Sequence, residues 1–304
     1  MESIEKSVGA GGSNLPVDVI KVQNLLNNSD LYTGLSAPLP ITGLVEANMI
    51  AAIKCFQSKQ PQLKMANPDG RVDPGGGTLA QLNGTQNSSQ PYQSYLPANF
   101  ANNPLTQINL DGFLSLYVKQ YPSPALSSSS QQALRGLLAN IIKDSPGIDL
   151  RWAAYMLATV KHECANTWQP IEEYGKGKNL KYGVTVNVLG PNGETLSNVY
   201  YGRGYVQLTW DYNYQKMDTA LGLTGKSNSM YWYPQNALVP EIAYQIMSYG
   251  MQRGSFTGKK LQDYINGANC DYVNARRIIN GTDQASLIAG YANNIEYLLR
   301  FFHS

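Results

Sequence analysis

The sequence predicts a mainly α protein that also carries a small β-hairpin. It has 304 residues, about twice the ~150 that one domain usually takes, so two domains are expected. Apolar residues recur at helical spacing in several long segments. Polar and apolar residues alternate over 205–209, as they do in a short, half-exposed strand. Together these observations favour an α-rich fold with little sheet.

The N-terminal part of the chain predicts a small three-helix domain over residues 1–84. Apolar residues at helical spacing indicate helices over 16–26 and 49–56, and a shorter third helix follows over 78–82. Asp-Gly and Pro-Gly pairs separate the second helix from the third. A unit of this size has a small but sufficient core.

Residues 85–106 differ in composition from both sides. This stretch is rich in Ser, Asn, Gln and Pro and lacks hydrophobic periodicity, which is typical of a linker. Apolar periodicity returns afterwards and continues to the end of the sequence. We therefore expect a second, α+β domain over 107–304.

The composition excludes several classes of function. Lys and Arg number 23 against 21 Asp and Glu, so there is no basic excess for nucleic acid. No run reaches about 18 apolar residues, which predicts no membrane insertion. Three widely spaced cysteines imply no disulfide framework, and two histidines are too few for a His-rich metal centre. We expect no metal and no cofactor, whereas uncharged polar residues and 21 tyrosines favour a carbohydrate ligand.

The N-terminal residues resemble the common three-helix peptidoglycan-binding domain from Val8 to Asn83. The matching pieces are two helix motifs and one turn: Val22, Gln23, Leu25 and Leu26; Ala52, Ile53, Phe56 and Gln57; and Asp69-Gly70. The resemblance implies that this domain binds the bacterial cell wall. A docking or folding module is the alternative interpretation.

One helix, expected over residues 150–168, carries the first candidate acid. Trp152, Met156, Val160 and Cys164 form an apolar stripe at four-residue spacing. Glu163 lies beside this stripe near the end of the helix. Apolar neighbours and a helix C-terminus both disfavour a negative charge, so they predict a raised pKa for Glu163. A carboxylic acid that stays protonated near neutral pH can act as the general acid of a glycosidase.

Two further carboxylates follow that helix in sequence. Glu172 and Glu173 lie just beyond Pro170, before a stretch of about 25 residues rich in Gly, Asn and Pro. The expected strand over 205–209 and another helix from about 212 come next. This order can place two carboxyl groups on opposite walls of a cleft, as glycoside hydrolysis requires.

The C-terminal part resembles the lysozyme-like superfamily, in particular its branch of family 19 chitinases and phage endolysins. The resemblance runs from about Leu134 to Phe302. It is carried by four pieces of sequence: His162-Glu163, Gly202 to Trp210, Asn213-Tyr214, and Asp271 to Ala292. It implies an α+β lysozyme-like domain.

The resemblance implies a role for each acid. Glu163 matches the proton donor of the family. The second carboxylate would activate a water on the far face of the sugar, and Glu173 is the first choice for it, with Glu172 as a rival that also fits the spacing. Thr209 matches the hydroxyl residue that helps hold this water.

Substrate-binding residues follow from the same resemblance. Gln207 and Asn213 match residues that form hydrogen bonds with the N-acetyl sugar, and Tyr201 and Tyr205 are expected to line the sugar groove. Gln207 and Asn213 also fit a structural role, in which they tie the hairpin to the helix beneath it. Arg276 is expected to brace helices.

The sequence thus predicts a modular endolysin that hydrolyses β-1,4 bonds of peptidoglycan, with inversion at the anomeric carbon. The alternatives are a chitinase that acts on N-acetylglucosamine polymers and a catalytically inactive wall-binding component. The expected partner is peptidoglycan and the expected state is a monomer. No secretory signal is recognisable at the start, so we expect synthesis in the bacterial cytoplasm and action in the periplasm or wall, after release through holins or delivery by a secretion apparatus.

Overall fold

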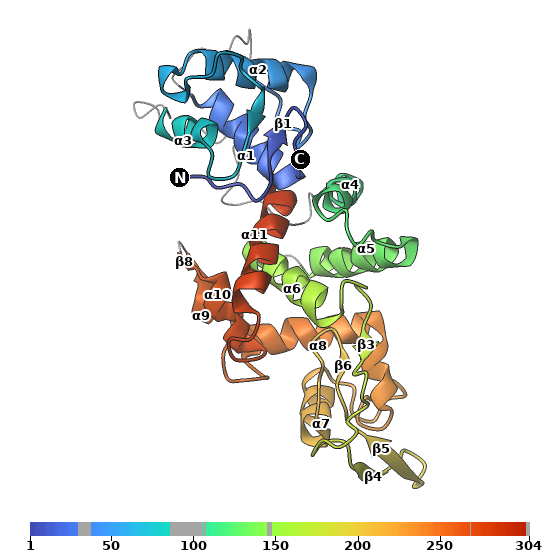
Figure 1. The fold of residues 1–304 in the computed structure, drawn as a ribbon. Helices are drawn as coiled ribbons and strands as arrows, with labels where there is room; N and C mark the ends of the chain where they lie inside the picture. The colour runs from blue at the N-terminus through green and yellow to red at the C-terminus, as the bar shows by residue number, and fades with distance from the viewer. Residues whose placement is uncertain (30–37, 86–104, 106–107, 145–147, 268, 302–304) are drawn as a thin grey trace. The chain divides into compact units, whose positions relative to one another are not determined.

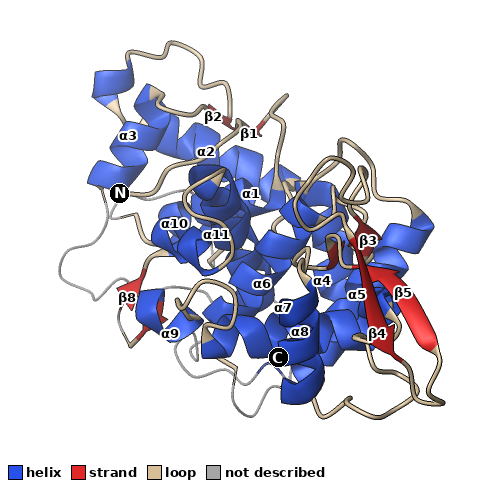
Figure 2. Ribbon diagram, turned by 90° about the horizontal axis from the view of Figure 1, so that it is seen from below, coloured by secondary structure: helices blue, strands red, loops and turns tan. Residues whose placement is uncertain are grey.

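The computed structural model describes the chain except for residues 30–37, 86–104, 106–107, 145–147, 268 and 302–304. Most regular elements are helices, and the strands are short, so the predicted mainly α class with a small β-hairpin is confirmed (Figure 2). No helix among the described residues is long and apolar enough to span a membrane.

The chain forms two compact units. The described residues of the first unit include β1 (Val8–Gly9), α1 (Pro16–Asn27), α2 (Ala47–Ser58), β2 (Arg71–Val72), α3 (Gly77–Gly84) and α4 (Leu110–Gln120), and β1 pairs with β2 in an antiparallel ladder. The three helices expected over residues 16–26, 49–56 and 78–82 are α1, α2 and α3 (Figure 1).

The core of the first unit comes from the predicted apolar positions. Val22 and Leu25 of α1 pack in one buried cluster with Ile53 and Phe56 of α2. The Asp-Gly turn is tied to α2 because Gln57 donates to Asp69 at 2.7 Å and accepts from the amide of the glycine at 2.9 Å. This turn is therefore held by the fold itself.

The first unit also contains α4, which the sequence analysis had assigned to the second domain. The Gln120 Oε1 atom accepts a hydrogen bond of 2.9 Å from the Val17 amide at the start of α1. Residues from Tyr297 onward, at the end of the last helix, belong to the first unit as well. Most of the expected linker lies outside the described residues; Thr85, which follows α3, and Leu105, which is buried, are described.

The second unit contains the remaining helices and three small ladders. Its helices are α5 (Ser128–Lys143), α6 (Leu150–Glu163), α7 (Asp211–Ala220), α8 (Pro240–Arg253), α9 (Leu261–Tyr264), α10 (Tyr272–Ala275) and most of α11 (Ala285–Phe301). Its strands are β3 (Ile171–Glu172), β4 (Thr185–Leu189), β5 (Thr195–Val199), β6 (Arg203–Gly204), β7 (Ile265–Asn266) and β8 (Asn269–Cys270). All three ladders are antiparallel, pairing β3 with β6, β4 with β5 and β7 with β8.

The hairpin of this unit lies elsewhere than expected. β4 and β5 form it, inside the stretch rich in Gly, Asn and Pro that the sequence analysis left as a loop. Of residues 205–209, expected as a strand, 205–207 form a turn and Leu208 makes an isolated antiparallel bridge with Arg203; Tyr205, Val206 and Leu208 are all buried. The alternation was misread because tyrosine was counted as an outward-facing residue, whereas Tyr205 is 2% exposed.

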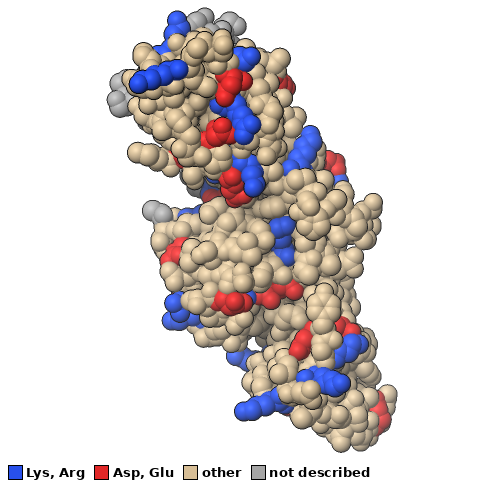
Figure 3. All heavy atoms as spheres, viewed as in Figure 1, with Lys and Arg blue, Asp and Glu red and all other residues tan. Residues whose placement is uncertain are grey.

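Charges are interspersed on the surface. On the face drawn in Figure 3, Lys and Arg mix with Asp and Glu, and most of the surface carries neither. This distribution agrees with the small net charge of +2.

Candidate active site

Helix α6 places Glu163 at its last residue. The predicted apolar stripe is confirmed at Met156, Val160 and Cys164, which are all fully buried. The helix ends at Glu163 and not at residue 168 as expected, because the chain then takes left-handed conformations, with φ of 48° at Ala165. Glu163 is therefore a helix-end side chain beside a buried face.

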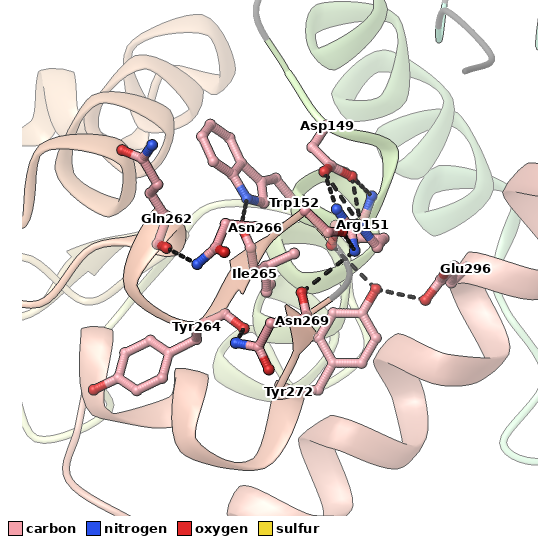
Figure 4. Close-up of polar contacts among 11 residues, drawn as sticks. Asp149, Arg151, Trp152, Gln262, Tyr264, Ile265, Asn266, Asn269, Tyr272 and Glu296 are labelled. Carbon is pink, nitrogen blue, oxygen red and sulfur yellow. Dashed lines mark hydrogen bonds and ion pairs between the residues drawn. The ribbon is translucent and has the colours of Figure 1, made fainter. Parts of the chain in front are cut away.

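The N-terminal end of α6 is fixed by polar contacts (Figure 4). Asp149 caps the helix and pairs with Arg151 at 2.6 Å, and Arg151 also donates to backbone carbonyls of the β7–β8 turn. Trp152 donates to the first residue of β7 at 2.9 Å. The Tyr272 hydroxyl lies 2.7 Å from Glu296 and 3.3 Å from the Arg151 carbonyl oxygen. The helix that carries Glu163 is thus held rigidly at its other end.

Glu163 forms an ion pair with a buried arginine. Its Oε1 atom lies 2.5 Å from Nη1 of Arg276, and the two side chains are 17% and 1% exposed. Arg276 also donates to the Asp283 carbonyl oxygen at 2.9 Å. The sequence analysis expected Arg276 to be a brace and missed it as the partner of the acid, because the two residues are 113 positions apart. Among the described residues, no hydrogen bond or ion pair involves Oε2 of Glu163.

The end of α6 lies against the β3–β6 ladder. The Cys164 sulfur is 3.9 Å from the Gly204 carbonyl oxygen and 4.0 Å from that of Tyr205. In the ladder, Ile171 pairs with Gly204, and Glu172 pairs with Arg203. The end of the helix that carries Glu163 is thereby brought against the ladder that contains Glu172 and is followed by Glu173.

The Glu172 carboxylate interacts with three neighbouring side chains. It accepts a hydrogen bond of 2.6 Å from the Tyr201 hydroxyl, pairs with Lys176 at 2.9 Å and lies 3.7 Å from Arg203 Nε. The Tyr201 hydrogen bond and the Lys176 ammonium hold the pKa of Glu172 below its usual value. Arg203 is itself buried and lies over the Tyr201 ring at 3.5 Å. Glu172 thus belongs to a local charge network.

Glu173 lies in a different environment. It accepts from the Tyr182 hydroxyl at 3.0 Å and from the Gly202 amide at 3.1 Å. A Cβ atom added at Gly202 would lie 3.4 Å from the Glu173 carboxylate and 2.8 Å from the Gln207 side-chain oxygen. Glu173 and Gln207 therefore both lie against this glycine, where a Cβ atom would require the Gln207 side chain to move. No cation pairs with Glu173 among the described residues.

The turn after β6 has unusual backbone geometry. Gln207 has φ of 53°, and its amide nitrogen donates to the carbonyl oxygens of Ile171 and Gly204. A non-glycine residue in this region costs free energy and is often found at functional sites. The amide nitrogen of Gln207 thus ties the turn to β3, and its side-chain oxygen lies against Gly202.

The remaining predicted site residues are Thr209, which is half-buried, and Tyr201 and Tyr205, which are buried. Thr209 is half-buried with its hydroxyl unbonded among the described residues, while its carbonyl oxygen accepts from Asn213 at 2.9 Å. Tyr201 and Tyr205 are 8% and 2% exposed. Tyr205 is thus a core residue, and the Tyr201 hydroxyl bonds Glu172, so the predicted substrate-binding role of these two tyrosines stays a prediction.

Three other aromatic residues form an aromatic strip that the sequence analysis missed. Tyr182 contacts Trp210 edge to face with ring centroids 5.6 Å apart, and Trp210 stacks with Tyr212 at 5.8 Å. Tyr212 is 56% exposed. Since the Tyr182 hydroxyl bonds Glu173, the aromatic strip begins at that carboxylate. Exposed ring faces of this kind suit the apolar face of a sugar.

The described residues contain no cluster of three or more His, Cys, Asp and Glu side chains that could hold a metal ion. The arrangement therefore offers two carboxylates, amides and aromatic rings. These groups can support proton transfer and sugar binding.

Known proteins resemble this chain in structure. No family model matches the sequence, and no curated protein matches it. Among solved structures, a bacterial family 19 chitinase is similar at 20% identity, over 62% of this chain and 92% of that chain, with a TM-score of 0.43. Chitinase C from Streptomyces griseus is similar at 20% identity over 66% of this chain and 95% of that chain, with a TM-score of 0.41.

Proposed function

We propose that the second unit hydrolyses β-1,4 glycosidic bonds of peptidoglycan glycan strands by acid and base catalysis. The observation that carries this proposal is the position of Glu163. It is a mostly buried carboxyl group at the end of α6, and its neighbour Cys164 contacts the ladder that leads to Glu173.

The roles of the two acids follow from their contacts. Arg276 holds Oε1 of Glu163, so in the proposed cycle the paired carboxylate takes up a proton on Oε2 before it acts as the acid. This proton passes to the glycosidic oxygen as the bond to the anomeric carbon breaks. Glu173 takes a proton from a water molecule whose oxygen attacks that carbon from the opposite face, so the configuration inverts. Inversion requires the two carboxyl groups to lie roughly 6.5–9.5 Å apart.

Glu173 is a better candidate for the base than Glu172. Glu172 is engaged by Tyr201, Lys176 and Arg203, whereas Glu173 accepts two neutral hydrogen bonds and adjoins Gln207 and the aromatic strip. The aromatic strip would bind a sugar ring, and the Thr209 hydroxyl would orient the water.

The first unit would hold the enzyme on the cell wall. Its resemblance to peptidoglycan-binding domains favours peptidoglycan over chitin as the substrate. Attachment raises the local concentration of substrate for the second unit. We place the action of the protein in the periplasm or wall, after release through holins or delivery by a secretion apparatus, and we propose that it acts as a monomer.

The test compares four Glu-to-Gln variants of the full chain on purified peptidoglycan and on chitin oligomers. Glu163→Gln and Glu173→Gln should each lower the rate of reducing-end release by about 10²–10⁴. Glu172→Gln should lower it less, and Glu194→Gln, in the β4–β5 turn, should leave it unchanged.

Several outcomes would change the proposal. Near-full activity of Glu163→Gln would refute it. Loss of activity in Glu172→Gln with retention in Glu173→Gln would exchange the roles of these two acids. Turnover of chitin oligomers without turnover of peptidoglycan would make the protein a chitinase.

A further inference from the structure

A cavity of about 380 Å³ lies in the second unit, and none of the acids discussed above lines it. One wall is a face of α8, whose lining residues recur at helical spacing from Gln245 to Arg253. The other walls are Asp144, which caps the C-terminal end of α5, and the end of α7 with Leu221. Its volume is at the small end of the ~300–1,000 Å³ range of ligand pockets, which suits a short ligand.

The polar groups of this cavity are largely free to bind. Among the described residues, the side chains of Gln245, Tyr249 and Arg253 have no hydrogen bond or ion pair. Gln252 donates its amide to Ser248 at 2.8 Å, which leaves its side-chain oxygen available. The cavity thus presents both donors and acceptors.

A hydrogen bond from Tyr244 fixes the Asp144 carboxylate, one of the acceptors of the cavity. The Tyr244 hydroxyl donates to Oδ2 of Asp144 at 2.8 Å, and Tyr244 is 4% exposed. The other oxygen of this carboxylate has no partner among the described residues. Asp144 and Arg253 also form no ion pair with each other, although both line the cavity. A ligand that is neutral overall, with donors for the carboxylate and acceptors for the guanidinium, fits these two charges.

We propose that this cavity is a second binding site for an N-acetylated amino sugar of a glycan chain. An acetamido group carries an N–H for Asp144 and a carbonyl oxygen for Arg253. Ring hydroxyls suit the Gln245 and Gln252 amides, and the Tyr249 ring, at 36% exposure, can stack on the sugar face. The proposal takes its class of ligand from the proposed function, but it needs no catalysis.

The experiment titrates the full-length chain carrying Glu163→Gln with the trimer of N-acetylglucosamine, by calorimetry and by amide chemical shifts. Two sites should be seen, with shift changes at α8 for one of them. Tyr249→Ala and Gln252→Ala, each added to that background, should weaken the α8 site at least tenfold and leave the other unchanged. Gln215→Ala and Lys216→Ala, on the exposed face of α7, are the matched controls and should change neither site.

The readouts separate this proposal from the proposed function. In the otherwise native chain, Tyr249→Ala should leave hydrolysis of short soluble oligomers unchanged and should lower the initial rate on insoluble wall severalfold. If the native chain binds the trimer at α8 but hydrolyses neither peptidoglycan nor chitin oligomers, the second site is supported and only the catalytic proposal is refuted. Absence of shift changes at α8, or equal affinity in Tyr249→Ala, would overturn the second site.

Discussion

Replacing Arg276 with methionine should destabilise the second unit by about 3–5 kcal/mol. Removal of one partner of a buried ion pair costs this much because the other charge is left uncompensated, whereas an exposed pair contributes only ~0–1 kcal/mol. The pair with Glu163 belongs to the buried case, since the two side chains are 1% and 17% exposed. At ~2–4 °C per kcal/mol for a unit of this size, the melting temperature should fall by roughly 10 °C.

Tryptophan fluorescence makes this measurement specific to the second unit. All four tryptophans belong to it: Trp152, Trp168, Trp210 and Trp232. Their emission during thermal or urea unfolding therefore reports this unit, even if the chain does not unfold in one step. Arg277→Met is the matched control, since Arg277 is exposed, and it should cost less than about 0.5 kcal/mol.

A double-mutant cycle tests the cause of this loss. Glu163→Gln alone leaves a buried guanidinium without its counter-charge and should also be destabilising. The double variant of Glu163→Gln and Arg276→Met should then cost less than the sum of the two single changes, because no lone charge remains. If the two effects add to within about 0.5 kcal/mol, or if Arg276→Met costs less than ~1 kcal/mol, the ion pair does not stabilise the fold as argued.

Three other changes test the packing of the second unit. Burial lowers the pKa of Lys161 to about 8, so above that pH this side chain binds more protons in the unfolded chain than in the native one. The free energy of unfolding, taken relative to that of Lys161→Met, should therefore rise by about 2 kcal/mol from pH ~7.5 to ~9.5, and the same pH dependence in both chains would contradict this. Gly183→Ala places a Cβ 1.8 Å from a backbone carbonyl oxygen and should cost about 1–3 kcal/mol in urea unfolding, whereas Gly175→Ala, with open space, should cost less than 1. Tyr214→Phe removes a hydroxyl that accepts from buried Arg203 at 3.2 Å and should cost about 1–3 kcal/mol; an unchanged melting curve would show that the guanidinium is satisfied without it.

Helical periodicity in the sequence predicted the position of Glu163. The stripe of Met156, Val160 and Cys164 faces the core as expected, and this stripe fixes where Glu163 lies relative to the buried face. Helical periodicity could not identify Arg276 as the ion-pair partner of Glu163. Arg276 follows in a distant segment, and only the folded chain shows that its guanidinium reaches this carboxylate.

The small strands were the hardest part of the sequence to interpret. A run of five residues around Gln207 alternates in polarity, but its backbone turns with φ of 53° at that residue. A two-residue ladder such as β3–β6 leaves no periodic signal at all. The β4–β5 hairpin does have a recognisable sequence pattern. Val186 and Val188 alternate with polar residues before Asn192-Gly193, a pair typical of turns.

The contribution of α4 to the first unit affects how the protein can be divided. A single proteolytic cut within residues 86–104 would leave α4 on the C-terminal fragment, although it packs with α1. The Val17 amide would then lose Gln120 as its acceptor, and the Lys21 ammonium would lose the Tyr297 ring, 5.4 Å away. Nicked protein should therefore elute as one species under native conditions, and the N-terminal fragment alone should refold poorly until the other fragment is added back.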